Sequence, residues 1–470
     1  MMAGVMACLT MVAQPALQRG AESKALDIDD LMNGRYIGRS ERADVWIMEG
    51  RRHVKQVVRM DLNMQSVQST PLAKSGDLQV LAATLDDEGD AAVLLADQSD
   101  NRHSRVLAAR TVREGYDTLL NWEHGRRDNC MLWGASSPNG DRLAFVAVLQ
   151  LNETKQYRTW IAVYDQKLQL LWEREFALGS LSDVMVTDSG RVVTLGIEED
   201  EVETHFIFNT MDARHASSYD ATVKCDPIRE VHLASVVGPV AVAVGTYMPT
   251  GMRKADRYTA GVIGLAFDLD VAELKGVTMR PFQNEDMNVF LNKKTKKIQR
   301  SQVMDHVKTL ATMPTGYGAV VALSHQRVEE TSEEGGTRRD GYSVGVHLAA
   351  VDTTGHVRWV RNVRRMAHQK GGDDQLKVGL VSMGDRICMV MNESAKEPAV
   401  YDIANAGREV EPGDKGNIVI YMMEEDGTTN KLLLEVKSKQ TVMRALPSAD
   451  GSLLYYTLRG SKCRAAELKF

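Results

Sequence analysis

The sequence is poor in the residues that mark disulfide scaffolds and zinc sites. Only five of its 470 residues are cysteine, and none forms a Cys-x-x-Cys pair. Its eleven histidines are scattered, without a His-Glu-x-x-His run or a close pair at zinc-ligand spacing. These absences exclude the common patterns of structural zinc sites and zinc hydrolases. Beyond Cys8, we interpret the cysteines as small buried hydrophobes, while a long-range disulfide of unspecified pairing stays open among Cys130, Cys225, Cys388 and Cys463.

A surplus of one charge sign is also missing. Lys and Arg total 57 and Asp and Glu total 63, so the formal net charge is −6. A surface that binds a nucleic acid backbone needs clustered Lys and Arg. The basic cluster at 292–300 lies close to the acidic stretch 284–288, and we interpret it as a solvated surface segment. We therefore expect no nucleic-acid partner.

Long apolar runs are absent except at the N-terminus. Residues 1–13 are apolar apart from Thr10, which is the length of a signal-peptide core and too short to span a bilayer. The basic residues that normally precede such a core are missing, which indicates that the true start codon lies upstream of Met1. We predict a signal peptide over 1–25 and an exported, soluble mature chain, 26–470, in the periplasm or associated with the outer membrane.

Two details of the export signal stay open. Cleavage is predicted either around Ala13 to Ala16 or near Ala25, because small residues occur at both places. Cys8 loosely matches a lipid-attachment site. Since apolar residues continue after it, the sequence favours a cleaved signal over lipidation.

Signatures of catalysis are missing as well. There is no Gly-x-Ser-x-Gly elbow, and "TDSG" at 187–190 is interpreted as a hairpin turn. "DIDD" at 27–30 lacks the Gly and the terminal Glu of a calcium loop. His232 and His347 lie in apolar strands, where we expect hydrogen-bonded core or rim residues. We predict no catalytic, metal-binding or cofactor-binding residue, and no cofactor.

Short segments typical of β-strands fill the chain instead. They are rich in Val and Ile or alternate with period two, and they occur at 141–151, 184–197, 239–248, 260–270, 317–328, 386–394 and 417–427. Turn dipeptides recur between such segments, at Asn139-Gly140, Ser189-Gly190, Thr354-Gly355, Asp426-Gly427 and Asp450-Gly451. Helical spacing is confined to about 284–300, an insertion that is either a helix or a long charged loop. The pattern predicts an all-β fold.

One phrase occurs twice and indicates a repeat. A strand ends in Asp, a turn follows, and the next strand carries a Trp, as in Asp165 to Trp172 and in Asp352, Gly355 and Trp359. Repetition over this length, without a linker, predicts a single β-propeller of about seven four-stranded blades, within a range of six to eight, with long charged loop insertions. We expect an apolar inner strand in each blade. The five named residues are assigned structural roles, with each Trp filling a gap between blades.

Several short phrases resemble known propeller families. "SSPNGDRLAFV" resembles the repeat turn of periplasmic TolB-type propellers, and "TTGHVRWVRNV" resembles the Trp phrase of PQQ-like propellers. The stretch from about 160 to 400 is similar to a family of exported, uncharacterised propeller-like proteins of Gram-negative envelopes. The matching residues are Asp165 to Phe176, Gly245 to Tyr247, Gly355, Trp359, Gln369 and Met391 to Glu393, where an aromatic residue is missing and Glu replaces Asp. This resemblance implies an exported propeller and no particular activity.

Two hypotheses about function follow. The first is a non-enzymatic binding or scaffold module of the cell envelope, whose partner is an envelope protein or a glycan. The charged loops at 198–203, 284–300 and 329–340 are its candidate contact sites. The second is a carbohydrate-active or other hydrolase with a site at the mouth of the central channel. A tight cluster of two carboxylates with an Arg or His at that mouth would support the second hypothesis.

Overall fold

A computed structural model describes most of the chain. The described residues are 18–22, 26–27, 35–49, 55–61, 67–73, 78–100, 102–178, 180–200, 203–249, 258–283, 286, 307–333, 336–370, 378–394, 416–447, 451–459 and 462–470. The predicted insertion at 284–300 therefore lies outside the described residues, apart from Asp286. The described residues contain no helix that is long and apolar enough to cross a membrane.

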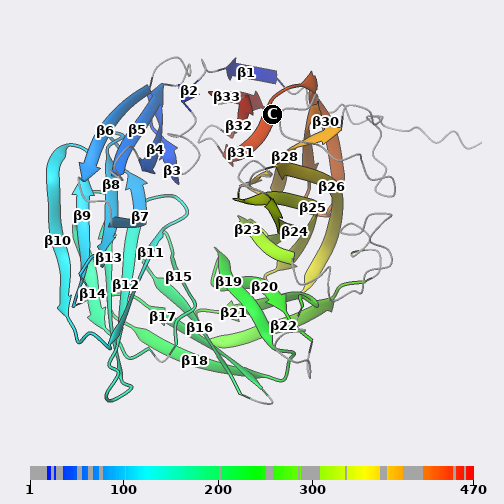
Figure 1. Ribbon diagram of the computed structural model, residues 1–470. Helices are drawn as coiled ribbons and strands as arrows, with labels where there is room; N and C mark the ends of the chain where they lie inside the picture. Colours follow the sequence, from blue (N-terminus) through cyan, green and yellow to red (C-terminus); the bar gives the residue numbers. More distant parts are fainter. Residues whose placement is uncertain are drawn as a thin grey trace, which may run out of the picture.

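Eight antiparallel sheets stand side by side in a ring, so the chain is a β-propeller with eight blades (Figure 1). From the ring axis outward, blade 1 contains β3 (Arg35–Arg39), β4 (Ala43–Glu49), β5 (Lys55–Asp61) and β6 (Val67–Ala73), and blade 2 contains β7 (Leu78–Leu85), β8 (Ala91–Asp97), β9 (His103–Arg110) and β10 (Arg113–Glu123). Blade 3 contains β11 (Asn129–Ser136), β12 (Arg142–Gln150), β13 (Tyr157–Asp165) and β14 (Leu170–Glu175), and blade 4 contains β15 (Asp183–Val186), β16 (Val192–Glu199), β17 (Thr204–Met211) and β18 (Ala216–Val223). In the same order, blade 5 contains β19 (Ile228–Val237), β20 (Val240–Tyr247), β21 (Gly261–Asp268) and β22 (Glu273–Pro281), and blade 6 contains β23 (Val307–Thr315), β24 (Gly318–Glu333), β25 (Gly336–Asp352) and β26 (Val357–Lys370). Blade 7 contains β27 (Gly379–Met383), β28 (Arg386–Ser394), β29 (Gly416–Met423) and β30 (Thr429–Ser438), and blade 8 contains β31 (Thr441–Pro447), β32 (Leu453–Arg459), β33 (Lys462–Lys469) and β1 (Gln18–Glu22).

The order of the strands defines two faces of the ring. In blades 1 to 7 consecutive strands pair antiparallel, so the fourth strand returns the chain to the face where the inner strand began. All inner strands therefore begin on one face, which we name the crossover face. It carries the connections between blades and those between second and third strands. The opposite face, named the turn face, carries the first-to-second and third-to-fourth turns.

The N-terminal strand completes the last blade. β1 is the outer strand of blade 8 and pairs antiparallel with β33, while the short β2 (Leu26–Asp27) pairs with the beginning of β33. Blade 8 thus combines the two ends of the chain. Blade 8 meets blade 1 at an interface that we name the seam. There, Trp46 of blade 1 packs edge-on against Tyr456 of blade 8, with ring centroids 5.1 Å apart.

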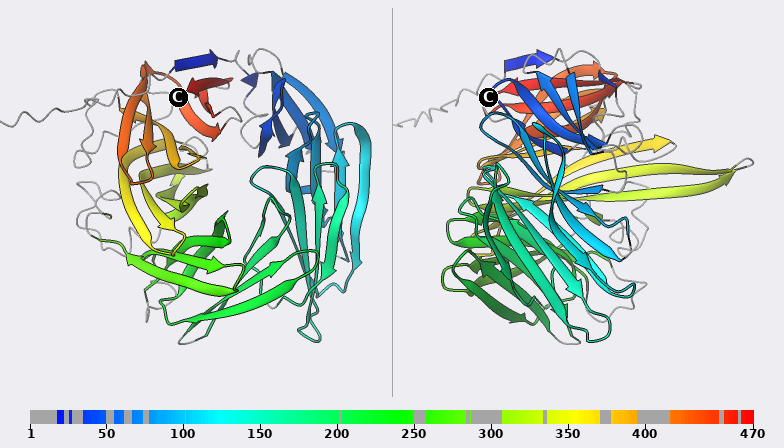
Figure 2. Two further views of the ribbon diagram at one scale, coloured as in Figure 1. Left: turned by 180° about the vertical axis from the view of Figure 1, so that it is seen from behind. Right: turned by 90° about the vertical axis from the view of Figure 1, so that its left-hand side faces the viewer.

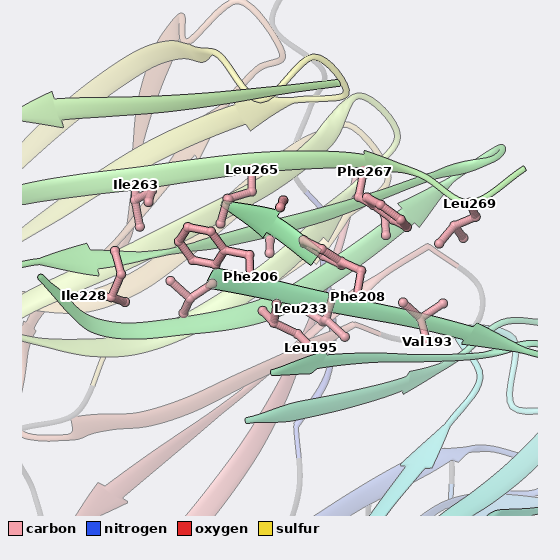
Figure 3. Packing of buried hydrophobic residues seen from close by; sticks show 14 of the residues in the cluster. Val193, Leu195, Phe206, Phe208, Ile228, Leu233, Ile263, Leu265, Phe267 and Leu269 are labelled. Atoms are coloured by element: carbon pink, nitrogen blue, oxygen red, sulfur yellow. The ribbon is translucent and has the colours of Figure 1, made fainter. Parts of the chain in front are cut away.

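The core consists of eight hydrophobic clusters, one at each interface between neighbouring blades. Figure 3 shows the cluster between blades 4 and 5, where Phe208 and Phe267 stack with ring centroids 4.4 Å apart. Side chains alternate between the two faces of a strand, so each blade contributes to the clusters on both of its sides. The blades are therefore held together mainly by burial of apolar surface between them.

The prediction of an apolar inner strand in each blade holds only in part, because β7 is mostly buried whereas most of β23 is half-buried or exposed. The second and third strands are buried along almost their whole length, as in β8, β20 and β21. The inner strand β19 is only partly buried. Middle strands have a strand on either side and a blade on each face, whereas one edge of an inner strand borders the ring axis.

The number of blades lies within the predicted range of six to eight, although seven was the favoured number. Blade length varies widely, because blade 4 is complete between Asp183 and Val223 and blade 6 extends from Val307 to Lys370. Most blades also lack the repeated Trp phrase. Dividing the chain length by a typical blade length therefore favoured one blade too few.

Blade 6 carries a long projection on the crossover face. β24 and β25 have 16 and 17 residues and pair along their whole length, from Gly318 and Asp352 to Glu333 and Gly336. His325 pairs with Val307, the first residue of the inner strand, so the two strands run on past that end of the blade. We name residues 326–343 the ribbon; Figure 2 shows it reaching well beyond the ring. The prediction of a loop at 329–340 is wrong, because residues 329–333 and 336–340 pair across the two strands.

Candidate functional site

The two predicted Trp residues lie at interfaces between blades. Trp172 of β14 packs against the cluster between blades 3 and 4, and its indole N–H donates to the carbonyl of Gly190 at 3.0 Å. Trp359 of β26 is 6% exposed in the cluster between blades 6 and 7 and donates to the carbonyl of Glu425 at 2.9 Å. In both cases the acceptor belongs to a turn of the next blade on the turn face. Each side chain thus joins two blades.

The predicted Asp residues organise third-to-fourth turns. Asp165 Oδ1 accepts the backbone N–H groups of Lys167 and Gln169, both at 2.8 Å, and Asp352 Oδ1 accepts those of Thr354 and His356 at 2.8 and 3.1 Å. These bonds fix the turn before the next strand begins.

Two further turns, in blades 4 and 5, were not predicted. Their Asp212 and Asp268 accept the N–H groups of the second and third residues that follow them, instead of the second and fourth. The feature in the sequence that could have identified these two turns is an Asp at the end of an apolar strand. Neither Asp is followed by the Gly and Trp of the repeated phrase.

The predicted Gly355 lies in the third-to-fourth turn of blade 6. Its φ of +80° is in the left-handed region, and a Cβ there would lie 2.5 Å from the carbonyl oxygen of Gly276 in the preceding blade. Glycine is required both for the backbone conformation and for this close approach. The five predicted positions therefore do not converge on one site, since each serves its own turn or interface.

The turn face contains hollows over interfaces between blades, and Arg–carboxylate pairs join the blades there. One hollow of about 750 Å³ between blades 1 and 2 contains Arg59 and Asp90, paired at 3.1 Å. Another of about 410 Å³ contains Arg191 and Asp270 of blades 4 and 5, also paired at 3.1 Å. A third, of about 710 Å³, contains Arg358 of blade 6 and Glu425 of blade 7, which lie 2.7 Å apart. These arginines have carboxylate partners within the protein, which indicates a structural role.

A different cluster lies at the rim of the ring on the crossover face. Asp183 is the first residue of β15, and Glu230 and His232 lie near the beginning of β19. Period-two alternation places Glu230 and His232 on the same side of their strand. The fourth member is Thr309, near the beginning of β23. We name these four residues the rim cluster, which joins the inner strands of blades 4, 5 and 6.

The distances within the rim cluster show how it is held. His232 Nδ1 lies 3.6 Å from Asp183 Oδ2, and His232 Nε2 lies 3.9 Å from Glu230 Oε2. Asp183 Oδ2 also accepts the N–H of Leu233 at 2.9 Å. Glu230 Oε1 accepts the hydroxyl of Thr309 and its N–H, the latter at 3.3 Å. The side chains of His232, Glu230 and Asp183 are 41%, 32% and 23% exposed, so solvent or a ligand reaches them.

The charges of the rim cluster stabilise one another. Asp183, followed by Glu230, raises the pKa of His232 to about 9. The imidazolium of His232 is the main reason that the pKa of Glu230 falls to about 2, and the donors of Thr309 add to this effect. At neutral pH both groups are therefore charged. A general acid or base works best with a pKa near the working pH, and neither group meets that condition.

The other histidine singled out in the sequence is buried. His347 Nδ1 donates to Asn362 Oδ1, and the amide of Asn362 donates to Asp286 Oδ1 at 3.0 Å. Asp286 in turn accepts Arg280 at 2.9 Å. Burial lowers the pKa of His347 to about 4, so the imidazole is neutral at pH 7. This chain of hydrogen bonds connects blade 6 to the segment that follows β22.

Cysteines and metal ligands give no further site among the described residues. Cys130, Cys225 and Cys388 form no disulfide, and the first two are half-buried while Cys388 is fully buried. Burial raises the pKa of the Cys388 thiol to about 12, which keeps it protonated. Within the ranges described above, no group of three or more His, Cys, Asp or Glu side chains is arranged to hold a metal ion.

Two of the three charged segments predicted as contact sites lie on the crossover face. The tip of the β16–β17 hairpin falls within 198–203, where Glu203 donates its N–H to Asp200 Oδ1 at 2.7 Å. The ribbon contains 329–340. Both are second-to-third connections, so they share a face with the rim cluster. The third segment, 284–300, lies outside the described residues apart from Asp286.

Comparisons with known proteins assign the chain to no family. No protein-family model matches the sequence, and no curated protein matches it. Among solved structures, the chain is similar to the WD40 domain of SCAP from fission yeast, at 11% identity and a TM-score of 0.39, over 95% of this chain and 98% of that one. It is also similar to a post-proline cleaving enzyme from Rickettsia typhi, at 7% identity and a TM-score of 0.39, over 92% of this chain and 58% of that enzyme. For puromycin hydrolase the identity is 10% and the TM-score 0.36, over 93% of this chain and 61% of that one.

Proposed function

We propose that this protein is a non-enzymatic binding or scaffold module of the cell envelope. It is exported to the periplasm or associated with the outer membrane, and it binds an envelope protein or a glycan on its crossover face. The observation that carries the proposal is that this face combines the ribbon, the β16–β17 hairpin tip and the exposed rim cluster. In propellers, connections that exceed what the ring needs are where function resides.

The ribbon is the strongest part of this argument. Its strands pair with each other beyond the end of the inner strand, from Gln326 opposite Ser343 to Glu333 opposite Gly336. β26 extends alongside, with Gln369 opposite Gly341. This paired backbone projects a semi-rigid surface away from the ring (Figure 2). Ordering such a surface before binding reduces the entropy lost when a partner docks.

A capture experiment with matched variants tests the proposal. In the first variant, residues 327–342 are replaced by Asn-Gly, which joins the paired residues Gln326 and Ser343 through a two-residue turn. The control is Val271→Ser, at a residue 63% exposed in a turn on the turn face. Wild type and control should retain the same partner from envelope extract, and the shortened variant should retain at least about tenfold less. Equal retention by all three proteins would contradict the proposal.

The rim cluster supports a second candidate, a carbohydrate-active or other hydrolase. Two carboxylates flank a histidine at the mouth of the ring, which is the arrangement this hypothesis requires. The binding role is favoured because His232 and Glu230 are both held in their charged forms at neutral pH. A hydrolase that used either group as its general acid or base would need that group to exchange a proton there.

The hydrolase hypothesis has its own test. Wild type and Glu230→Gln are incubated with envelope glycans and with casein at pH 7, and new reducing ends or amines are measured. For a binding module, both proteins should give the background rate. Turnover by wild type that falls at least about a hundredfold in Glu230→Gln would identify an enzyme instead.

A further inference from the structure

The pairing of β1 bears on how the N-terminus is processed. Gln18 pairs with Lys469, Arg19 with Leu468 and Glu22 with Ala466. β1 therefore lies along the C-terminal half of β33. β2 adds the pairs Leu26 with Cys463 and Asp27 with Lys462.

The edge that β1 covers belongs to the core of the last blade. β33 contributes Ala465, Ala466 and Leu468, which are 0%, 6% and 1% exposed, to the clusters on both sides of blade 8. Without β1 this strand would be an open edge, with backbone groups that lose their partners. The ring would also lose most of the backbone pairs that hold the N-terminal segment, which leads into blade 1, against blade 8.

The sequence leaves two sites for removal of the export signal. Cleavage around Ala13 to Ala16 leaves all of β1 on the mature chain. Cleavage near Ala25 removes all of β1 and leaves only the two pairs of β2. The two sites therefore give mature proteins with different last blades.

We propose that processing of this chain occurs ahead of Gln18, so that β1 stays on the mature protein and closes the ring. The inference rests on the export that forms part of the proposed function. It goes beyond that function by assigning the position of the modification. Hydrolysis of the peptide bond by a signal peptidase needs only water as co-reactant. Attachment of lipid at Cys8 would also keep β1.

The first test is the intact mass and N-terminal sequence of the protein recovered from its native host. The gene is expressed from its native locus, and the envelope and cytoplasmic fractions are analysed separately. A mature N-terminus at or before Gln18 in the envelope fraction is the expected result. A mature N-terminus after Glu22 would overturn the inference while leaving export intact. An uncleaved chain in the cytoplasm would overturn both the inference and the export.

The second test separates the role of β1 from export. Chains that begin at Gln18 and at Leu26 are produced in the cytoplasm of a laboratory host, each after a single Met. The chain from Gln18 should melt at the same temperature as the full chain. The chain from Leu26 should melt at least about 5 °C lower or fail to fold. Equal melting temperatures for the two shortened chains would contradict the role of β1 as the closing strand.

Discussion

At the scale of single residues, a few polar side chains and glycines define the turns of the blades. Asp165, Asp212, Asp268 and Asp352 each accept two backbone N–H groups at the start of a third-to-fourth turn. This pattern recurs in four consecutive blades, although only two copies are visible as phrases in the sequence. The bond from the second residue after the Asp is therefore common to all four turns, although the surrounding residues differ.

Gly355 provides a test of how closely neighbouring blades approach. In Gly355→Ala, the left-handed φ of +80° and the Cβ 2.5 Å from the Gly276 oxygen both act against folding. We expect a loss of about 2–4 kcal/mol in the free energy of unfolding, measured by urea denaturation.

Gly451→Ala is the matched control, because its φ is +78° and no described atom lies within 4 Å of a Cβ there. This variant should lose only about 1–2 kcal/mol, the cost of the backbone conformation. Equal losses in the two variants would show that the contact between blades contributes nothing.

His347 predicts an acid-sensitive stability. Its pKa is about 4 when folded and 6.5 as a free side chain, so the unfolded chain binds the proton more strongly. Between these values the free energy of unfolding falls as the pH falls, by up to about 3 kcal/mol in total. The neighbours Asn362, Asp286 and Arg280 keep the neutral imidazole in place.

The measurement is the melting temperature of wild type and His347→Gln at pH 7 and pH 5. The Gln amide retains a donor for Asn362 but does not titrate. Wild type should lose more stability than the variant on moving to pH 5. If the variant loses as much stability as wild type at pH 5, groups other than His347 cause the acid sensitivity.

At the scale of elements, a strand's position in its blade determines how clearly the strand could be predicted from the sequence. Six predicted segments correspond to β12, β20, β21, β24, β28 and β29, all second or third strands, and the segment at 184–197 contains the β15–β16 hairpin. Their strong signal comes from burial on both faces between neighbouring blades. Inner and outer strands carry mixed patterns, as in β19 and β14, and were harder to find.

The two Trp residues differ in burial, and their substitutions should differ accordingly. Trp359→Ala removes a side chain that is 6% exposed, together with its bond to Glu425. We expect a loss of about 3–5 kcal/mol. Trp172→Ala, at a half-buried position, should lose about 1–3 kcal/mol. Urea denaturation of both variants measures the two losses, and the reverse order would show that burial of the side chain does not set their size.

At the scale of the whole molecule, closure of the ring depends on contacts between the ends of the chain. Arg39 in blade 1 pairs with Asp44 at 2.9 Å and with Glu467 of blade 8 at 3.3 Å. The side chains are 8%, 0% and 8% exposed. Ser452 also donates to Glu467, at 2.9 Å. The seam therefore contains a buried ionic network beside the aromatic contact of Trp46.

Arg39→Met tests this seam. It leaves the carboxylate of Asp44 buried without its cation, while Glu467 keeps Lys469 at 3.6 Å, so we expect a loss of about 3–5 kcal/mol. The matched control is Arg191→Met, which breaks a pair with Asp270 whose carboxylate is 62% exposed. The control should lose less than about 1 kcal/mol in urea denaturation. Similar losses in the two variants would show that the buried pair of Arg39 contributes no more to stability than the exposed pair of Arg191.

Much of the architecture followed from local patterns, while the candidate site did not. Short apolar strands, Gly-containing turns and the repeated Asp-to-Trp phrase were sufficient to predict a propeller of six to eight blades. The rim cluster was not predictable, because Asp183, His232 and Thr309 are separated by tens of residues and meet only through three adjacent inner strands. The ribbon was missed for another reason, since its charge and glycine content are typical of a loop.

Local sequence patterns were sufficient for the all-β class, the repeat and the turns, because these depend on neighbours within a few residues. The number of blades, the convergence of the rim cluster and the role of Gln18–Glu22 as a closing strand became apparent from the folded ring alone. Each of these depends on pairings between residues far apart in the chain, such as Gln18 with Lys469. Such pairings leave no local periodicity, since they form only when the whole ring has closed.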